Sequence, residues 1–264
     1  MTEHIKAEVL LKAEHVNLSL CDKPILRDIN FSIKNIIRPN VLQGQVVTLI
    51  GRSGIGKTQL FRILSGLQEP SSGRIIINHD QTVKPGDMGV IFQNYYLFEW
   101  RTIYSSMMLA ARQNKSLQGK EKEAIEKYVT EFGLKDVLFQ YPGQLSGGQR
   151  QRVSIIQQLL KGSDFLLLDE PFSGLDVCML DKVVDLLLQV SLSDELKTLI
   201  IVSHDIPTAV SISDTVFILG SEPGMPGATL RKEIDLIERD LAWQKDVKKS
   251  SCFLDTIEEI KACL

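Results

Sequence analysis

Gly51-Arg52-Ser53-Gly54-Ile55-Gly56-Lys57-Thr58 is the stretch that decides the fold. It follows an apolar run at residues 46–50 and leads into residues 59–64, so we expect a strand, a glycine-rich turn and a helix. Glycines let the backbone N–H groups point inward, and the helix adds its positive end, so such a turn can hold phosphate groups. Lys57 would neutralise phosphate charge, and Thr58 would offer its hydroxyl to Mg²⁺. The stretch therefore predicts a site for a nucleoside triphosphate.

The composition is that of an ordinary globular protein. With 264 residues, of which 44% are hydrophobic and 24% charged, the chain fits one domain, or one domain with a lobe. Its 30 basic and 33 acidic residues form no runs of like charge, which argues against a nucleic-acid or anionic-membrane surface. The apolar runs are much shorter than the ~20 residues of a membrane-spanning helix, and residues 1–6 lack the apolar core of a signal peptide. We therefore expect a cytosolic protein whose four cysteines, Cys21, Cys178, Cys252 and Cys263, stay reduced.

The first half of the chain changes from a strand pattern to a helix pattern. Residues 8–34 alternate in the manner of strands and predict an antiparallel sheet, whereas residues 34–44, with Pro39, predict a surface loop. Further strands are expected at 74–78 and 88–92. Residues 93–161 predict a helical lobe inserted between two strands of the main sheet. Within it, an apolar stripe at helical spacing is expected to pack in the core: Ala124, Ile125, Tyr128, Val129 and Phe132.

In the second half, a continuous apolar run at residues 165–168 ends in Asp169 and Glu170. This pattern is typical of a buried parallel strand that delivers charge at its carboxyl end. We expect a helix at 176–190, a strand at 198–202 that ends at Ser203-His204-Asp205, and a strand at 215–219. After the Gly- and Pro-rich residues 220–227, a short strand or loop and a charged helix complete the chain.

Leu145-Ser146-Gly147-Gly148-Gln149 is the second informative stretch, and it stands directly before a predicted helix. Two glycines at a helix N-terminus leave free N–H groups that can bind an anion, and Ser146 adds a hydroxyl. The same string could serve only as a helix cap. Together with the glycine-rich turn at 51–58, however, it is strongly specific.

At this point the sequence resembles the ATP-binding cassette (ABC) family, the ATP-hydrolysing subunits of ABC transporters, over residues ~8 to ~220. Six motifs appear in the family's order. Residues 51–58 match the Walker A motif, Gln93 the Q-loop and residues 145–149 the signature. Residues 165–169 match Walker B with the catalytic carboxylate Glu170 after it, residues 173–176 match the D-loop, and His204 matches the switch histidine. The resemblance implies an α/β fold: a P-loop NTPase core with a parallel sheet, an antiparallel β lobe and an inserted α-helical lobe that bears the signature.

The resemblance also implies a role for each motif residue. Asp169 would hold Mg²⁺, together with Thr58 and Gln93. Glu170 would polarise the attacking water, His204 would stabilise the γ-phosphate region, and Gln93 would sense it. The nucleotide-contacting residues would be Gly51, Arg52, Ser53, Gly54, Ile55, Gly56, Lys57, Thr58, Gln59, Ser146, Gly147, Gly148, Gln149 and Asp176.

In this family the signature of one subunit completes the ATP site of another. The resemblance therefore implies two ATP molecules shared by a pair of cassettes, which we expect to be a homodimer. The expected partners are integral-membrane permease subunits and, indirectly, a solute-binding protein, with no nucleic acid. The chain would lie on the inner face of the cell membrane. Residues 1–219 would form one nucleotide-binding domain, with residues 93–161 as its inserted lobe and residues 220–264 as a C-terminal extension.

Three departures from the family pattern concern affinity more than hydrolysis. Leu20-Cys21 stands where an aromatic residue usually stacks on adenine. Gln59 replaces the usual Ser or Thr, which removes a possible α-phosphate contact, and residues 156–158 (Ile-Gln-Gln) replace a common Ala-Arg-Ala. Residues 97–102 and 222–224 most resemble the importer branch that serves nitrate, sulfonate and taurine-like solutes.

Two other functions compete with the transporter subunit. One is a soluble ABC ATPase that acts on nucleic acid or ribosomes; the single cassette and the lack of a basic surface argue against it. The other is a regulatory nucleotide-binding module that does not hydrolyse ATP; Asp169, Glu170 and His204 argue against that. The sequence does not identify the transported solute.

Overall fold

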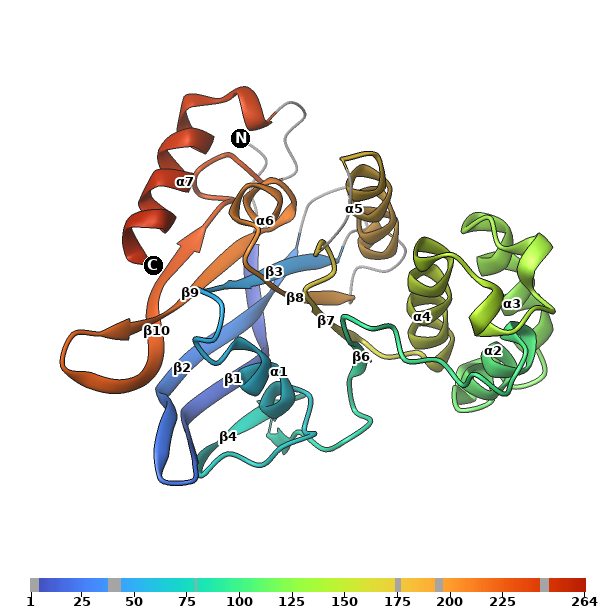
Figure 1. Ribbon diagram of the computed structural model, residues 1–264, viewed down its shortest axis with the longest axis horizontal. Helices are drawn as coiled ribbons and strands as arrows, with labels where there is room; N and C mark the ends of the chain where they lie inside the picture. The colour runs from blue at the N-terminus through green and yellow to red at the C-terminus, as the bar shows by residue number, and fades with distance from the viewer. Residues whose placement is uncertain (1–4, 38–43, 79, 174–176, 193–196, 243–246) are drawn as a thin grey trace.

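The computed structural model describes residues 5–37, 44–78, 80–173, 177–192, 197–242 and 247–264. Within these residues one ten-stranded sheet runs through the molecule in the order β5-β4-β1-β2-β10-β9-β3-β8-β7-β6 (Figure 1). A parallel part and an antiparallel part therefore share one sheet.

The parallel part is the core of the fold. β3 (Gln45–Ile50) pairs with β8 (Thr198–Ser203) on one side and with β9 (Thr215–Glu222) on the other. β7 (Phe165–Asp169) pairs with β8, and the short β6 (Gly89–Ile91) forms the edge. Every residue of β3, β7 and β8 is buried, as continuous apolar runs require when helices cover both faces. The predicted parallel core is confirmed.

The antiparallel part begins with a long hairpin of β1 (Ile5–Leu20) and β2 (Lys23–Ile37), to which β4 (Ser72–Ile77) and β5 (Gln81–Thr82) are added. The predicted loop at 34–44 is wrong at its start. β2 continues to Ile37 because Lys34 and Ile36 still pair with Val9 and Lys6 of β1. The remainder of that predicted loop, 38–43, lies outside the described residues.

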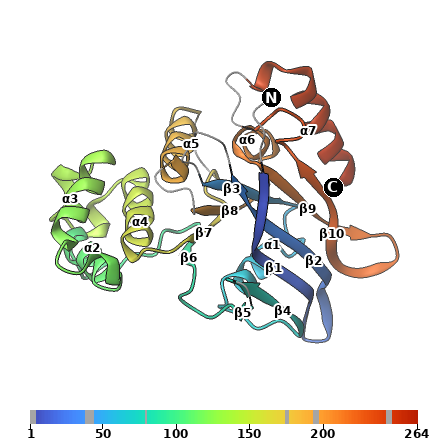
Figure 2. The same ribbon diagram turned by 180° about the vertical axis from the view of Figure 1, so that it is seen from behind.

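Between β6 and β7 the chain forms helices, as predicted. They are α2 (Ile103–Ala111), α3 (Glu121–Glu131), α4 (Gly147–Lys161) and three short 3₁₀ turns at Lys115–Leu117, Lys135–Val137 and Pro142–Gln144. Both views show α2, α3 and α4 together at one end of the molecule, far from α1 (Lys57–Leu64) (Figures 1 and 2). The predicted stripe of α3 is confirmed, because Ile125, Val129 and Phe132 are buried in the core there and Ala124 and Tyr128 pack against them.

The remaining elements cover the other end of the sheet. α5 (Val177–Leu192) follows β7, and α6 (Ile206–Ile212) follows β8. β10 (Met225–Asp235) pairs with β9 and is longer than the predicted short strand or loop. After a 3₁₀ turn at Val247–Lys249, α7 (Ser251–Cys263) buries its apolar face against β9, β10 and α6, through Phe253, Ile257 and Ile260.

Two exclusions made from the sequence can be compared with the described ranges. No helix there combines the length and apolar character needed to cross a membrane. Cys21, Cys252 and Cys263 are free thiols, and the side chain of Cys178 lies outside the described residues.

Candidate nucleotide-binding site

The glycine-rich turn joins the buried strand β3 to helix α1 at the carboxyl edge of the parallel sheet. Gly56 caps α1 with φ +113, a conformation that suits glycine, and a Cβ there would lie 3.1 Å from Leu26 Cδ2. A Cβ on Gly51 would lie 2.9 Å from the carbonyl oxygen of Leu219. Glycine at both positions therefore lets the turn close tightly against β2 and β9.

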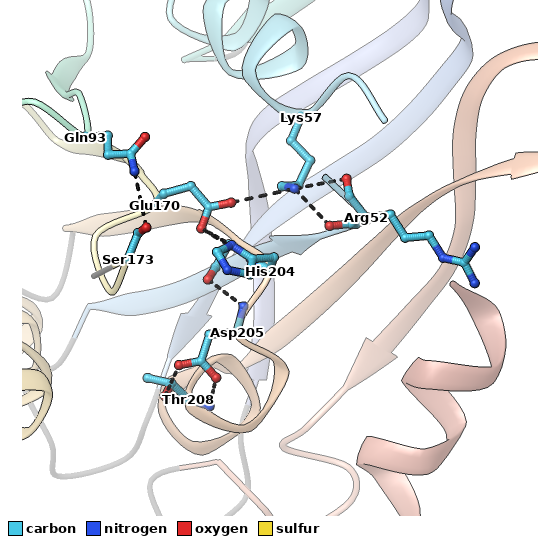
Figure 3. Close-up of polar contacts among 10 residues, drawn as sticks. Arg52, Lys57, Gln93, Glu170, Ser173, His204, Asp205 and Thr208 are labelled. Carbon is cyan, nitrogen blue, oxygen red and sulfur yellow. Dashed lines mark hydrogen bonds and ion pairs between the residues drawn. The ribbon is translucent and has the colours of Figure 1, made fainter. Parts of the chain in front are cut away.

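Lys57 is buried at the first position of α1. Its Nζ donates to the carbonyl oxygens of Gly51 at 2.9 Å and Arg52 at 3.1 Å, so the ammonium lies inside the turn (Figure 3). The N-terminal N–H groups of α1 have no partner within the helix, and the helix end carries partial positive charge. The turn thus presents concentrated positive potential, which suits a polyphosphate.

Asp169 lies at the end of β7 and is only 8% exposed. Burial raises the pKa of this carboxyl group, the charge of Glu170 raises it further, and Lys57 and Arg62 oppose the rise. Its Oδ1 atom is buried and finds no hydrogen-bond partner among the described residues. A buried carboxylate oxygen without a partner is costly unless a cation satisfies it.

This orphaned oxygen fits a divalent cation. The described residues contain no cluster of three or more His, Cys, Asp or Glu side chains suited to a metal ion. A cation at Asp169 would therefore take its other ligands from hydroxyl groups, water and phosphate oxygens, which is the usual environment of Mg²⁺ beside a nucleotide. Thr58, at the start of α1, is the hydroxyl that the motif places there.

Glu170 connects the turn to the predicted switch histidine. Its Oε1 lies 3.6 Å from Lys57 Nζ, and its Oε2 lies 2.8 Å from His204 Nδ1 and accepts a hydrogen bond from the His204 backbone N–H at 3.3 Å (Figure 3). Its backbone has φ +49, unusual for a residue with a side chain, and its N–H donates to Val202 at the end of β8. The ends of β7 and β8 and the start of α1 thus bring three predicted site residues together: Lys57, Glu170 and His204.

Gln93 lies in the segment after β6, and its Nε2 donates to Ser173 Oγ at 3.2 Å. Ser173 stands three residues after Glu170, so the predicted Q-loop touches the segment that carries the predicted base (Figure 3). Asp176, the predicted D-loop residue, lies outside the described residues.

The predicted signature lies elsewhere. Ser146 caps α4: its Oγ accepts from the N–H of Gln149 at 3.3 Å, and Gln149 Oε1 accepts from the N–H of Ser146 at 2.8 Å. Gly147 and Gly148 supply the next N–H groups, and a Cβ on Gly147 would meet nothing within 4 Å. This helix end therefore faces open space, and no hydrogen bond or ion pair between described residues joins it to the P-loop.

Two residues near the site have a positioning role that the sequence did not predict. Ser173 was expected only as the first residue of the D-loop, and the structure shows its contact with Gln93. Asp205 caps α6: its carboxylate accepts from the N–H and the hydroxyl of Thr208 at 3.2 and 2.7 Å. Asp205 fixes the chain directly after His204. The sequence pattern that could have predicted this cap is an Asp two residues before Pro207, because Asp favours the N-cap and Pro the first turn of a helix.

Leu20 ends β1 and is 41% exposed. Cys21 and Asp22 follow with φ +48 and +61, so they form the tight turn of the β1–β2 hairpin. The structure therefore presents Leu20 as an accessible apolar side chain at the position where the family's aromatic residue would stand.

Leu20→Tyr should tighten ATP binding, since stacking of a base on an aromatic ring contributes about 1–3 kcal/mol in nucleic-acid-binding proteins. The wild-type protein should bind GTP within about tenfold of ATP, because the phosphate contacts are common to both nucleotides. Titration of both proteins with both nucleotides measures this. Leu67→Tyr, at another exposed leucine, is the matched control. A wild-type preference for ATP far above tenfold, unaltered by Leu20→Tyr, would show that another residue contacts the base.

Comparison with known proteins agrees with this geometry. The model of the ABC transporter family matches residues 35–173. The solved structure of cbiO1 from Clostridium perfringens, described as part of the ABC transporter complex cbiONQ, is similar with a TM-score of 0.69 and 26% identity. That similarity covers 88% of this chain and 90% of the other.

Two curated relatives span most of the chain. An uncharacterized ABC transporter ATP-binding protein of Bacillus subtilis (strain 168) is 36% identical over 212 residues, which are 80% of this chain and 78% of the relative. A taurine import ATP-binding protein of Pelagibacter ubique (strain HTCC1062) is 31% identical over 242 residues, 89% of this chain and 85% of the relative. Since the family model covers more than half of the chain, including the phosphate-binding turn and the carboxylates at 169 and 170, and both relatives span most of it, the chain belongs to the ABC transporter family and is an ATP-binding, ATP-hydrolysing subunit.

Proposed function

We propose that two copies of this chain form two ATP sites at their interface and that hydrolysis there drives a membrane-embedded importer. One observation carries the proposal: the two anion-binding helix ends, at α1 and α4, do not meet within one chain, and the end of α4 faces open space. Each half-site is well formed alone. A second copy is the simplest source of the missing half.

In the proposed site the N–H groups of the P-loop and Lys57 bind the β- and γ-phosphates of ATP. Asp169, Thr58 and Gln93 would hold Mg²⁺, which when bound would supply positive charge to stabilise the transferring phosphoryl group. Glu170 accepts a proton from the attacking water. His204 holds the Glu170 carboxylate at 2.8 Å, which orients it for that transfer. Ser146, Gly147 and Gly148 of the second copy donate to the γ-phosphate.

The contact between Gln93 and Ser173 gives a route by which nucleotide binding at the site can change the helical lobe. If Gln93 turns toward the bound cation, it must release Ser173 Oγ, so the segments after β6 and after β7 change together. Because the chain runs from Gln93 directly into the helical lobe, a change at Gln93 is passed to α2 and α4.

We further propose that the permease docks on the helical lobe. A cavity of about 310 Å³ lies there, lined by Tyr96, Leu97, Phe98, Leu109, Gln113 and Lys161 among others. Two of its lining groups, Ser106 Oγ and Gln157 Nε2, are buried and have no hydrogen-bond partner among the described residues. Tyr96 is 70% exposed, and Phe98 and Trp100 are exposed beside it. An apolar patch with unsatisfied polar groups favours a protein partner.

Tyr96→Ala should weaken assembly with the permease by at least tenfold, because exposed aromatic residues are the commonest anchors of interfaces. The measurement is co-purification with, and ATPase stimulation by, the integral-membrane subunits of the transporter. Leu254→Ala, at an exposed leucine of α7 on the opposite end of the molecule, should change neither. Full assembly of Tyr96→Ala would show that the permease binds another surface.

The remaining parts of the proposal follow from this arrangement. The chain would lie against the inner face of the cell membrane, with residues 1–219 as one nucleotide-binding domain and 220–264 as its extension. A periplasmic or extracellular solute-binding protein would contact the permease and not this chain. No observation favours a soluble nucleic-acid-associated ATPase or a regulatory module.

A further inference from the structure

A second cavity, of about 150 Å³, lies on one face of the core sheet at the amino ends of β3 and β9. The strand register defines its wall. Val47 pairs with Thr215, and Phe217 pairs with Glu233, so these four residues share one face of the sheet. The opposite wall is the end of β2, residues 32–36. This cavity is separate from the lobe cavity and from the P-loop.

The cavity exists because β2 and β10 diverge. They pair at one position, Leu26 with Ala228, and the gap beyond it is first filled by Phe31 and Phe217, whose ring centroids lie 4.8 Å apart. Further along, no backbone pairing between β2 and β10 is found among the described residues, and the cavity lies between them. Its far side is bounded by Lys6 of β1, which forms ion pairs with Asp235 and, at 3.6 Å, with Glu238.

Two oppositely charged side chains line this space without pairing to each other. Lys34 comes from β2 and Glu233 from β10, and neither has an ion-pair partner within 4 Å among the described residues. Partial burial raises the pKa of Glu233, and the nearby carboxylates of Asp235 and Glu238 raise it further. The charges of Lys6 and Lys34 oppose that rise, so Lys34 is near enough to act on Glu233. Because Lys6 is already paired with Asp235, Lys34 is the cation available to a ligand.

The rest of the lining is apolar with a few hydrogen-bonding groups. Ile33, Ile36, Val47 and Phe217 supply the apolar surface, and Ser32, Thr215 and Gln45 the polar atoms. The volume equals that of about five water molecules at ~30 Å³ each in the liquid, so it admits a small molecule but no nucleotide. Six of the ten described lining residues are polar or charged, so the cavity offers several convergent polar groups beside four apolar side chains. Concave sites that combine an apolar surface with convergent polar groups bind small ligands.

We propose that this cavity binds a small zwitterion, a molecule with one ammonium group and one carboxylate joined by a short carbon chain. Glu233 binds the ammonium, Lys34 binds the carboxylate, and the apolar wall contacts the chain. The site is distinct from the ATP site, because β3 runs six residues from Gln45 to the P-loop, which is about 20 Å at ~3.3 Å per residue. The proposal does not depend on the proposed permease or dimer.

Titration calorimetry of the full-length protein with glycine, β-alanine, 4-aminobutyrate, 5-aminovalerate and leucine tests the proposal. At least one should bind saturably with a Kd below about 10 mM. Two analogues of the tightest-binding compound should bind at least tenfold more weakly: the matched acid without the amine, and the matched amine without the acid. Each leaves one charged side chain of the cavity without an ion-pair partner. If none of the five binds, or if a singly charged analogue binds equally well, the proposal is wrong.

Variants locate the site. Lys34→Gln and Glu233→Gln should each weaken binding of that zwitterion at least tenfold. Lys12→Gln, at an exposed lysine of the same hairpin outside the cavity, should leave it unchanged. All three should bind ATP like the wild type, which shows that they are folded. Unchanged zwitterion binding in both cavity variants would place the ligand elsewhere and overturn the assignment.

Discussion

Glu170→Gln should lower ATP turnover by about 10²–10⁴-fold while ATP still binds. The amide retains the size of the carboxylate and can still accept a hydrogen bond from the N–H of His204, but it cannot take a proton from water. The substitution also removes a negative charge 3.6 Å from Lys57 Nζ. Lys57 is then free to bind phosphate without competition from Glu170, so ATP should bind at least as tightly as in the wild type.

Two measurements test this together: steady-state phosphate release, and gel filtration with Mg-ATP. Because bound ATP is not consumed, the variant should elute as a dimer with ATP and as a monomer without it. Glu131→Gln, at a half-exposed glutamate of α3, is the matched control and should behave as the wild type. Turnover at the wild-type rate would exclude Glu170 as the base, and a monomer with Mg-ATP would count against the shared site.

The parts of the fold that could be predicted are those with a local signal. The P-loop is continuous in sequence, β3, β7 and β8 are apolar throughout, and the stripe of α3 repeats at helical spacing. In each case the residues that specify the structure lie within about fifteen positions of one another. The spacing of apolar residues and the residue types of the turns are therefore sufficient to predict it.

The parts that could not be predicted depend on distant residues. The end of β2 is a strand because β1 pairs with it, although Pro39 and the irregular pattern favoured a loop. Gln93 contacts Ser173 across 80 positions, and Lys6 contacts Asp235 across 229 of the chain's 264 (235 − 6 = 229). No local pattern encodes such pairs. The positive φ of Glu170 could not be predicted either, because residues other than glycine seldom adopt it. The surrounding strand ends impose this conformation.

The candidate site likewise has features that the sequence predicts and features that only the structure shows. The motif resemblance supplied the residues, and the structure showed that Lys57, Glu170 and His204 are in contact whereas residues 145–149 are not. The orphaned Oδ1 of Asp169 is a property of burial that no motif states. It is this atom that makes a divalent cation fit the site on physical grounds.

Ser146→Arg should abolish hydrolysis and spare ATP binding, whereas Lys57→Ala should abolish both. The arginine adds bulk and charge where the γ-phosphate bound to the other copy would lie, but it leaves the P-loop of its own chain intact. Ser146 also caps α4, and losing a cap costs about 1 kcal/mol of stability, so Ser146→Ala is the matched control: it loses the cap and the hydroxyl but adds no bulk or charge to the site. Fluorescent ATP analogues measure binding, and phosphate release measures hydrolysis.

Mixing the two inactive variants gives the sharpest test of the shared site. A dimer of one Lys57→Ala copy and one Ser146→Arg copy has both defects in one composite site, and its other site is built from an intact P-loop and an intact signature. If copies exchange at random, half of the dimers are mixed and each has one intact site of two, so activity should recover to about a quarter of the wild type. If each chain hydrolysed ATP with its own signature, mixing would restore nothing. Recovery on mixing therefore requires that the N-terminus of α4 acts on ATP held by another copy, and its absence with both variants folded would refute the proposed dimer.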